Sequence, residues 1–346
     1  MSKICNDLLN ALSTYTGKYE QVCFVVDEKV AKGEWLEATG EKLVLAVREE
    51  QKSLETVQRI WDFLFAQDVT RRGLVIAVGG GVLTDIAGFA AATYKRGVDY
   101  INVPTTLLAM VDASSGGKTG FNYQGLKNGI GLFAPPVETL IWPGWLSSLP
   151  ADQFLSGFAE MLKTGLIDNG KWKMENGKCL WSRLLQYDLD TMPLDTLTPL
   201  IEQCVAVKQQ IVDADPREEN LRKVLNFGHT FGHALEEISL TGKAGLLHGY
   251  AVLYGMIAEL YLSVTLLDCP QAPLQQLTQH MLHYYGKPQC KCSDMEALIA
   301  LMRRDKKNER ADEINCTLLY DIGKPAINQT INEVQAKEAL EYLFSL

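Results

Sequence analysis

The sequence predicts two domains: an α/β domain with a mostly parallel, Rossmann-like sheet over residues 1–150, and a mainly α-helical domain over residues 151–346. Three observations predict this division. The chain has 346 residues, which is long for a single hydrophobic core. Before Pro150, short β-branched runs alternate with amphipathic helical segments. After Pro150, from Ala151 to about Leu282, the pattern is helical and such runs are few.

The strands of the first domain are predicted from short apolar runs. These are Val22–Val26, Leu43–Val47, Leu74–Val78, Tyr100–Val103 and Thr139–Trp142. Between them, the segment Leu54–Phe65 is predicted to be a helix, because one stripe of it carries Leu54, Val57, Ile60, Trp61 and Leu64. In parallel sheets of this kind, ligands bind at the carboxyl ends of the strands.

A glycine turn follows the run Leu74–Val78. The chain continues with Gly79-Gly80-Gly81 and then VLTDIAGFAAATY, a helix rich in small residues. Glycines let a pyrophosphate approach the backbone, and a helix amino terminus favours anions. The G-x-G-x-x-G fingerprint is absent, so a tight structural turn is the alternative. Asp85 is either a nucleotide contact or a carboxylate favoured by the helix dipole.

The next segment, VPTTLLAMVDASSGGKTGFNYQGLKNGIGLF, combines many glycines with polar and basic residues. Its candidate ligand-binding residues are Thr105, Thr106, Asp112, Lys118, Asn122, Lys127 and Asn128. Glycine-dense loops with interspersed lysines commonly bind anions, which predicts an anion-binding loop. A solvated loop with surface lysines is the alternative.

In the second domain, GFAEMLKTGLI places Glu160 and Lys163 three residues apart on one helical face. Their neighbours are apolar, and a buried carboxylate needs a partner, which a metal ion would supply. The alternative is a surface ion pair of little energetic consequence.

Three of the five histidines lie in LNFGHTFGHALEE and LLHGY. His229 and His233 are four residues apart and share one helical face, and His248 follows after a short glycine-containing segment. Two or three imidazoles that converge in this way predict a metal site. Ordinary hydrogen-bonded histidines are the alternative.

Polar residues upstream extend this pattern. Arg222, Asn226, His229 and His233 recur with near-helical spacing, which predicts one ionisable stripe on a single helix and favours a functional site over a solvated face. Lys208 and Glu218 lie further upstream. Near the carboxyl end, MRRDKKNERADEINCTLLYDIGKPAI predicts a basic run, with Lys306 and Lys307, followed by a β-hairpin.

The composition excludes several classes of protein. A net charge of −9 argues against a general nucleic-acid or membrane surface. The start of the chain lacks a signal-peptide pattern, and no stretch is expected to reach the roughly 20 apolar residues of a membrane span. The eight cysteines are scattered apart from Cys290 and Cys292, which predicts reduced thiols in a cytoplasmic protein.

Motifs from about Val22 to Gly323 together resemble the 3-dehydroquinate synthase family. They are, in order, EEQKSLE at Glu49, GGGVLTDIAGFAA at Gly79, TYKRG at Thr93, VPTTLLAMVDASSGGKTG, GLKNGIG, GFAEMLK, the segment from Lys208 to Arg222, LNFGHTFGHALE, LLHG and RDKK. The resemblance implies an NAD-binding α/β domain, a helical metal-binding domain and a cleft between them. Each motif is moderately specific, and their order is highly specific.

The resemblance also implies the roles of individual residues. The metal, Zn²⁺ or Co²⁺, would be held by Glu160, His229 and His248, so that His233 becomes a substrate contact instead of a ligand. The implied NAD cradle is Asp27, Glu49, Lys52, Gly80, Gly81, Asp85, Thr105, Thr106, Asp112, Lys118 and Lys127. The implied substrate contacts are Asp112, Lys118, Asn128, Lys163, Lys208, Arg222, Asn226, His233 and one of Lys306 and Lys307. Arg96 would reach the substrate phosphate across a homodimer interface.

Some positions depart from the family pattern. Tyr250 stands where LHGEA usually has glutamate, Asp152 and Gln153 replace a common Arg-Glu, and Ser115 replaces a small apolar residue. None of these changes removes an implied catalytic group, although Tyr250 alters the surroundings of the metal site.

The implied reaction converts 3-deoxy-D-arabino-heptulosonate 7-phosphate into 3-dehydroquinate and phosphate, in the shikimate pathway of aromatic amino acid biosynthesis. It proceeds by transient NAD-dependent oxidation, phosphate elimination, re-reduction and intramolecular aldol closure. Alternatives are another sugar-phosphate cyclase, such as 2-deoxy-scyllo-inosose synthase, and a metal-dependent alcohol dehydrogenase that resembles glycerol dehydrogenase. A non-enzymatic chain with a relic pocket is disfavoured, because the residues specific to the chemistry are present.

Overall fold

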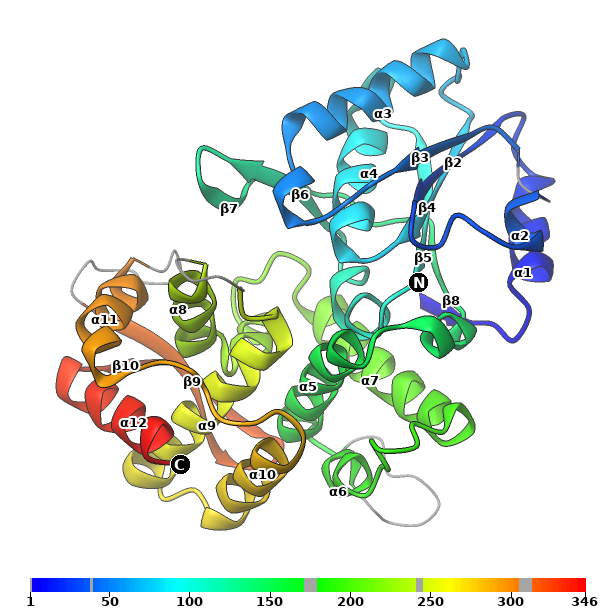
Figure 1. Ribbon diagram of the computed structural model, residues 1–346. Coiled ribbons are helices and arrows are strands. Elements are labelled where there is room, and N and C mark those ends of the chain that lie inside the picture. The colour runs from blue at the N-terminus through cyan, green and yellow to red at the C-terminus, as the bar shows by residue number, and fades with distance from the viewer. Residues whose placement is uncertain (1, 38–39, 171–178, 241–244, 305–312) are drawn as a thin grey trace. The chain divides into compact units, whose positions relative to one another are not determined.

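The computed structural model describes residues 2–37, 40–170, 179–240, 245–304 and 313–346 (Figure 1). The chain divides into two compact units, Met1–Pro150 and Ala151–Leu346, referred to below as unit 1 and unit 2. Each unit has its own buried core.

Unit 1 is built on a six-stranded sheet in which every pair of neighbouring strands is parallel. The strand order is β1 (Ser2–Ile4), β8 (Glu138–Ile141), β5 (Asp99–Pro104), β4 (Leu74–Gly79), β2 (Val22–Asp27) and β3 (Lys42–Leu45). All five predicted strands are confirmed within a few residues at their ends. The additional strand β1 has only three residues, which is too short to give a recognisable sequence pattern.

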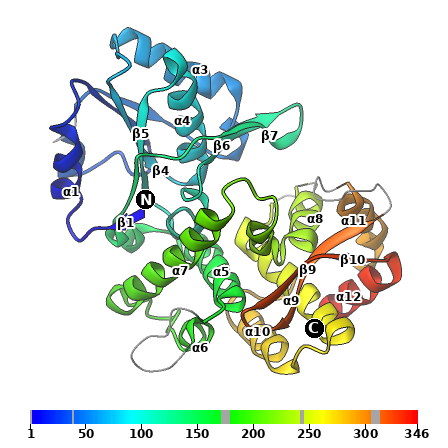
Figure 2. The same ribbon diagram turned by 180° about the vertical axis from the view of Figure 1, so that it is seen from behind.

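Helices cover both faces of this sheet, as Figures 1 and 2 show. On one side lie α1 (Leu8–Thr16) and α2 (Glu34–Glu37), and on the other α3 (Leu54–Ala66) and α4 (Gly81–Thr93). Shorter helical turns complete the unit: η1 (Glu49–Gln51), η2 (Tyr94–Arg96), the π-helical turn η3 (Ala109–Ala113) and η4 (Pro143–Ser148). These layers confirm the predicted α/β fold.

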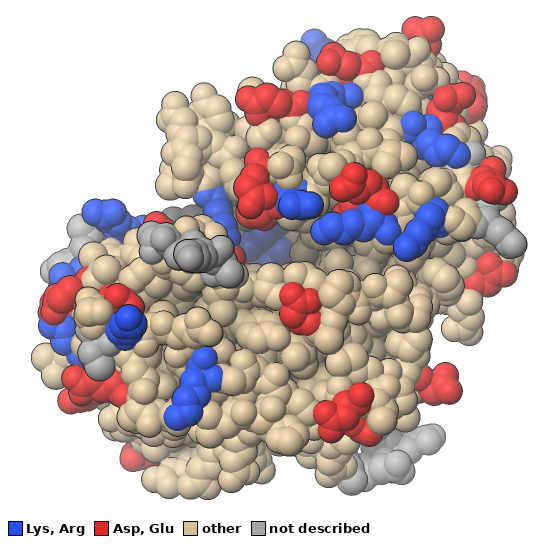
Figure 3. Space-filling view, viewed as in Figure 1, with Lys and Arg blue, Asp and Glu red and all other residues tan. Residues whose placement is uncertain are grey.

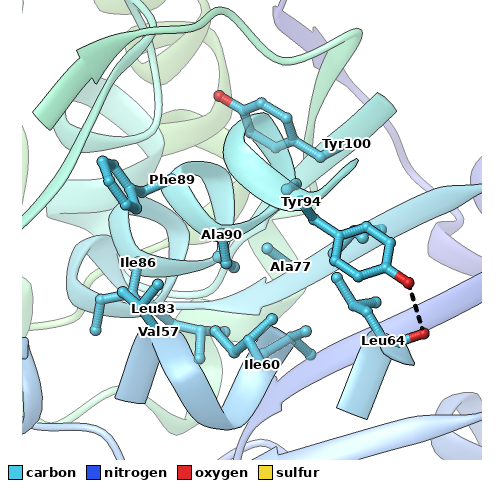
Figure 4. Close-up of a cluster of buried hydrophobic side chains, with 14 of the residues drawn as sticks. Val57, Ile60, Leu64, Ala77, Leu83, Ile86, Phe89, Ala90, Tyr94 and Tyr100 are labelled. Carbon is cyan, nitrogen blue, oxygen red and sulfur yellow. Dashed lines mark hydrogen bonds between the residues drawn. The ribbon is translucent and has the colours of Figure 1, made fainter. Parts of the chain in front are cut away.

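The core of unit 1 lies between α3, α4 and the sheet (Figure 4). Val57, Ile60 and Leu64 of the predicted stripe are fully buried there. Leu54 departs from the prediction, because it begins the helix and is 40% exposed. The Tyr94 hydroxyl donates to the carbonyl oxygen of Leu64 at 3.1 Å, so the polar end of a buried ring is satisfied inside the core.

The glycine-dense segment forms a β-hairpin over residues 118–133, so the predicted loop is wrong as a structure, while its anion binding stays a prediction. The strands β6 (Lys118–Tyr123) and β7 (Leu126–Phe133) pair antiparallel, with Gly120 opposite Gly131. A side chain at either glycine would collide with a backbone carbonyl of the opposite strand. The glycines are therefore explained by close backbone pairing, and they leave β7 exposed along its whole length.

Unit 2 is mainly helical, as predicted. Its helices are α5 (Ala151–Ile167), α6 (Leu180–Leu185), α7 (Leu194–Ala214), η5 (Leu221–Asn226), α8 (His229–Ser239), α9 (His248–Leu267), α10 (Gln271–Tyr284), η6 (Cys292–Asp294), α11 (Met295–Arg303) and α12 (Glu333–Ser345). The predicted hairpin near the carboxyl end is confirmed as β9 (Ile314–Asp321) and β10 (Lys324–Ile331).

Helix α9 is the core helix of unit 2 and packs against α5, α8, α10, α12 and β9. By length and composition alone, this 20-residue helix is apolar enough to cross a membrane, so the expectation that no stretch reaches this length is wrong. The physical reason is burial: 67% of the apolar window is enclosed by the surrounding elements of the unit. A helix that is packed on most of its faces needs apolar residues all around.

His280 of α10 is a buried histidine outside the predicted site. Its ring stacks on Phe158 with 6.0 Å between the ring centroids, and its Nε2 has no hydrogen-bond partner among the described residues. Burial, assisted by the neighbouring charge of His283, lowers the pKa of His280 to about 4. The folded state therefore holds this imidazole neutral, whereas the unfolded chain takes up a proton below about pH 6.5.

We expect the His280→Phe variant to lose part of the pH dependence of stability. Because the folded pKa is depressed, the wild-type protein loses stability as the pH falls from about 6.5 towards 4, by about 2 kcal/mol at pH 5. Urea unfolding at pH 7 and pH 5 measures this loss. The exposed His283→Gln keeps the buried imidazole and removes only the smaller contribution of the neighbouring charge, so it should retain most of the loss. An unchanged difference between the two pH values in His280→Phe would contradict the assignment.

Candidate active site

Three potential metal ligands from three helices of unit 2 converge. Glu160 lies on α5, His229 begins α8 and His248 begins α9. One ligand atom from each side chain lies within 4.8 Å of the other two. The Nε2 atoms of His229 and His248 lie 3.8 and 3.4 Å from Oε1 of Glu160. One carboxylate and two imidazoles at these separations suit a zinc-type ion with positions left open for a substrate.

The hydrogen bonds of the two imidazoles determine which nitrogen faces the site. Nδ1 of His229 lies 3.1 Å from the carbonyl oxygen of Phe227, and a carbonyl only accepts hydrogen bonds. Nδ1 of His248 lies 3.2 Å from a carboxylate oxygen of Glu236. Nδ1 of His229 therefore carries the proton in the neutral ring, and its Nε2 faces Glu160. In His248, Nδ1 faces Glu236 and Nε2 faces Glu160.

Burial and the neighbouring carboxylates together determine the pKa of His248 in this cluster. Burial opposes protonation of His248, but the carboxylates of Glu160 and Glu236 outweigh it and raise the pKa of His248 to about 10. Glu160 also forms a short ion pair with Lys163, and both side chains are at most 2% exposed. The predicted surface-pair alternative for Glu160 and Lys163 is therefore wrong. A metal ion bound at His248 would have to displace its proton.

His233 lies beside this group on the same face of α8 as His229, with 5.2 Å between their ring centroids. The interpretation of His229 and His233 as a shared metal pair is replaced by the Glu160, His229 and His248 cluster, which contains the ligand atoms that lie within reach of one ion. His233 is half-buried, and its ring centroid is 6.2 Å from that of His248.

The polar stripe from Arg222 to His233 does not lie on a single helix, so this prediction is wrong. The turn η5 ends at Asn226, and Gly228 has a left-handed backbone with φ of 80° before α8 begins. Left-handed conformations favour glycine and end a right-handed helix. The four side chains therefore project from two separate elements that the turn at Phe227–Gly228 joins.

Arg222 and Asn226 are anchored in η5 by acidic residues of the preceding segment. Arg222 is 2% exposed, its backbone N–H donates to Asp215 at 2.9 Å, and its Nη1 donates to the carbonyl oxygen of Pro216 at 2.7 Å. The Asn226 amide donates to Glu218 at 2.9 Å. These contacts hold an arginine and an amide in fixed positions.

Unit 2 buries an unusual number of cationic side chains. Lys163 on α5, Lys208 on α7 and Arg222 on η5 are 2%, 6% and 2% exposed, and α5 packs against both α7 and η5. Buried charges require anionic partners, and fixed cations are suited to carboxylate or phosphate recognition. Lys163, Lys208 and Arg222, which the resemblance implies as substrate contacts, therefore lie on neighbouring elements of one unit.

The predicted nucleotide-binding residues of unit 1 gather at the carboxyl edge of its sheet. Asp27 ends β2, Gly80 follows β4 and Thr105 follows β5, and these three strands are neighbours. Burial raises the pKa of Asp27, although a hydrogen bond from the Lys29 N–H opposes the shift. Strand ends at this edge are where doubly wound sheets bind ligands.

The glycine turn before α4 has both a structural and a binding explanation. A side chain at Gly79 or Gly81 would collide with Leu83 or Ala113, so packing alone requires these two glycines. At Gly80 the nearest atom to an added Cβ belongs to Thr106, at 3.3 Å. Gly80 caps α4 without a side chain, which leaves the first N–H groups of the helix available for an anion.

Several predicted cradle residues are joined by hydrogen bonds. Lys52 pairs with Asp85 at 2.6 Å. Asn122 donates to the Glu49 carboxylate at 2.8 Å and accepts from the Asn128 N–H at 2.8 Å. The β6–β7 hairpin is thus tied to η1, beside the carboxyl edge of the sheet.

The remaining predicted residues are placed as follows. Asp112 lies in η3, Lys118 begins β6, Lys127 lies in β7, and Arg96 ends η2 with an exposed side chain. Lys306 and Lys307 lie outside the described residues. On the face that Figure 3 shows, the coloured basic side chains are interspersed with acidic ones.

Sequence reasoning missed two carboxylates: Glu236, which lies 3.2 Å from His248 Nδ1, and the buried Glu259. Glu236 lies seven residues after His229 on α8, a spacing that places both on one helical face and could have been noticed. Glu259 is the one acidic residue within α9, and an isolated carboxylate in an apolar helix signals a buried partner.

Comparisons with known proteins cover nearly the whole chain. Residues 42–156 match the family described as 3-dehydroquinate synthase N-terminal, and residues 157–308 match 3-dehydroquinate synthase C-terminal. The 3-dehydroquinate synthase of Parabacteroides distasonis is 40% identical over 98% of this chain and 96% of its own length.

Two solved structures have a similar fold. The first is 2-epi-5-epi-valiolone synthase from Streptomyces hygroscopicus subsp. jinggangensis with NAD⁺ and Zn²⁺ bound, with a TM-score of 0.85 and 28% identity over 100% of this chain and 96% of that one. The second is 2-deoxy-scyllo-inosose synthase complexed with carbaglucose-6-phosphate, NAD⁺ and Co²⁺. It has a TM-score of 0.83 and 24% identity, over 99% of this chain and 96% of that one.

Proposed function

The chain belongs to the 3-dehydroquinate synthase family, and from this premise we propose that it converts 3-deoxy-D-arabino-heptulosonate 7-phosphate into 3-dehydroquinate and phosphate. The observation that supports the proposal is that unit 2 contains both a metal-type ligand cluster and buried cationic side chains. Glu160, His229 and His248 form the cluster, and Lys163 pairs directly with Glu160.

The donor set supports zinc or cobalt as the metal. Carboxylate oxygen and imidazole nitrogen suit Zn²⁺ and Co²⁺, and the Nδ1 hydrogen bonds already orient both imidazoles. The glycine turn at the amino terminus of α4 similarly suits the pyrophosphate of NAD. When bound, the metal would supply Lewis-acid chemistry and NAD would accept and return a hydride.

The buried cations are proposed to bind and orient the anionic ends of the substrate. Lys163, Lys208 and Arg222 would neutralise the carboxylate and phosphate groups, and burial excludes the water that would otherwise screen them. Asn226, whose amide is held by Glu218, would orient a hydroxyl group. His233 would contact the substrate next to the ligand cluster. Lys118 and Asn128 of the β6–β7 hairpin are further proposed contacts.

The proposed mechanism recycles NAD within each turnover, and this property distinguishes it from the rival dehydrogenase. A small fixed amount of NAD should support many equivalents of phosphate release, because the hydride removed in the first step is returned later in the same cycle. Phosphate release and absorbance at the NADH wavelength are measured together on the heptulosonate phosphate.

Two controls sharpen this experiment. Prior treatment with a chelator should abolish phosphate release, and added zinc should restore it. Accumulation of one NADH per substrate would contradict the proposal and favour an alcohol dehydrogenase. Turnover of glucose 6-phosphate in place of the heptulosonate would favour 2-deoxy-scyllo-inosose synthase.

We further propose that the active form is a cytoplasmic homodimer in which Arg96 reaches the phosphate site of the other chain. Lys95 and Arg96 have left-handed backbones with φ of 46° and 71°, and Gly97 follows with φ of 112°. Such conformations are strained for residues other than glycine and cluster at functional positions. The Arg71 guanidinium supports the turn by donating to the Lys95 carbonyl at 2.8 Å, while the Arg96 side chain is exposed.

A further inference from the structure

Glu259 is a buried carboxylate that the proposed reaction does not use. It lies in the middle of α9 and is 0% exposed. Its Oε2 accepts a hydrogen bond from the Gly228 N–H at 2.6 Å, and its Oε1 accepts one from the Thr230 N–H at 3.2 Å. Both oxygens thus accept from backbone donors on either side of the metal-ligand candidate His229.

These two donors belong to the amino terminus of α8, where Gly228 provides no side-chain cap. The first N–H groups of a helix have no partner within the helix, and a negative charge near them is stabilised by the helix dipole. Glu259 therefore caps α8 from a different helix. The close approach that this requires depends on Gly255, where any side chain would collide with the carbonyl oxygen of Gly228.

The contact continues through one peptide group to the His229 ring. The Gly228 N–H and the Phe227 carbonyl belong to the same trans peptide, so they point in opposite directions. Glu259 holds the N–H side, and Nδ1–H of His229 donates to the carbonyl side at 3.1 Å. A carboxylate that accepts from the N–H polarises the peptide and makes its carbonyl a stronger acceptor.

We propose that Glu259 is a positioning residue of the metal centre, which fixes the tautomer and orientation of His229 through the Phe227–Gly228 peptide. In many metal sites a carboxylate accepts a hydrogen bond directly from a ligating histidine. Here the Phe227–Gly228 peptide lies between the Glu259 carboxylate and the His229 ring. His248 has the direct version of the same support, from Glu236 at 3.2 Å. This inference rests on the metal site of the proposed function.

The test is the zinc affinity of the full-length Glu259→Gln variant, measured by competition with a chelating indicator. Glutamine keeps the size of the side chain, but its NH₂ group would face one of the two N–H donors. We expect zinc to bind about 10- to 100-fold more weakly, the range found when supporting residues of metal sites are changed. In ¹⁵N-histidine NMR of the zinc-free protein, His229 should lose its fixed Nδ1–H tautomer.

Ser263→Ala is the matched control. Ser263 lies one turn further along α9 and is equally buried. Its hydroxyl donates to the Glu259 carbonyl at 2.6 Å and accepts from the Leu319 N–H at 2.9 Å, and neither hydrogen bond involves α8. This variant should lower the stability of the zinc-free protein but leave zinc affinity unchanged. If Glu259→Gln does not fold, Glu259→Asp keeps the charge with a shorter reach, and it should also bind zinc more weakly.

The possible outcomes separate this inference from the proposed function. Wild-type zinc affinity in a folded Glu259 variant, or an equal loss in Ser263→Ala, would overturn the positioning role and leave the metal centre intact. A wild-type protein that binds no divalent metal would overturn the metal centre, and the positioning role with it.

Discussion

The His248→Ala variant is expected to lose its metal ion and its turnover while it keeps its fold. Alanine removes one of the three proposed ligands and leaves Glu160 and His229 as an incomplete set. Loss of a Lewis acid removes several kcal/mol of stabilisation from the transition state, which corresponds to a fall in turnover of about a thousandfold or more. Metal content per chain and phosphate release measure the two effects.

The fold should survive because His248 is at the amino terminus of α9, and the interior of that helix is unaffected. Circular dichroism and thermal unfolding of the metal-free proteins check this expectation. His283→Ala, an exposed histidine in the same unit, controls for loss of an imidazole. If His248→Ala retains a stoichiometric metal ion and full activity, His248 is not a ligand.

Mixing two inactive variants is expected to restore activity if Arg96 serves the site of the other chain. Arg96→Ala dimers lack the arginine in both phosphate sites, and Lys163→Ala dimers lack the buried lysine in both. A mixed dimer contains one site with both groups intact. Random exchange of equal amounts gives about half mixed dimers, and therefore about a quarter of wild-type activity.

The measurement is phosphate release after subunit exchange, with heterodimers verified by mass or by differential tags. Each variant alone, taken through the same exchange procedure, provides the baseline. Arg96→Lys should remain impaired, because an ammonium cannot replace a bidentate guanidinium on phosphate. If heterodimers are verified and activity is not recovered, Arg96 either acts in the site of its own chain or does not contribute to the reaction.

The parts of the fold that were predicted correctly are those whose signal is local. The β-branched runs from Val22 to Trp142 form the parallel sheet, because a strand buried on both faces needs a continuous apolar run. The change in the spacing of apolar residues after Pro150, from strand-like runs to a helical pattern, coincides with the boundary between the units. The spacing of His229 and His233 correctly indicated one helical face.

The features that were missed depend on contacts between distant segments. The turn at Phe227–Gly228, which separates η5 from α8, is stabilised by Glu259 and by the close approach of Gly255. Both residues lie on α9, the next helix along the chain. The spacing of the polar residues from Arg222 to His233 does not indicate these contacts. The hairpin at Gly120 and Gly131 was missed for the same reason, because glycine frequency indicates a loop unless the pairing partner is known.

The division of binding residues between the units has a thermodynamic consequence. The metal-ligand candidates all belong to Ala151–Leu346, and the candidate nucleotide cradle belongs to Met1–Pro150. A ligand that binds only the folded state stabilises that state, by an amount that grows with the logarithm of the free ligand concentration. In the proposed enzyme, free zinc therefore stabilises the folded state through unit 2, and free NAD stabilises it through unit 1. The stability of the protein then depends on two free concentrations, that of zinc and that of NAD, and a melting temperature measured at one pair of concentrations does not describe it.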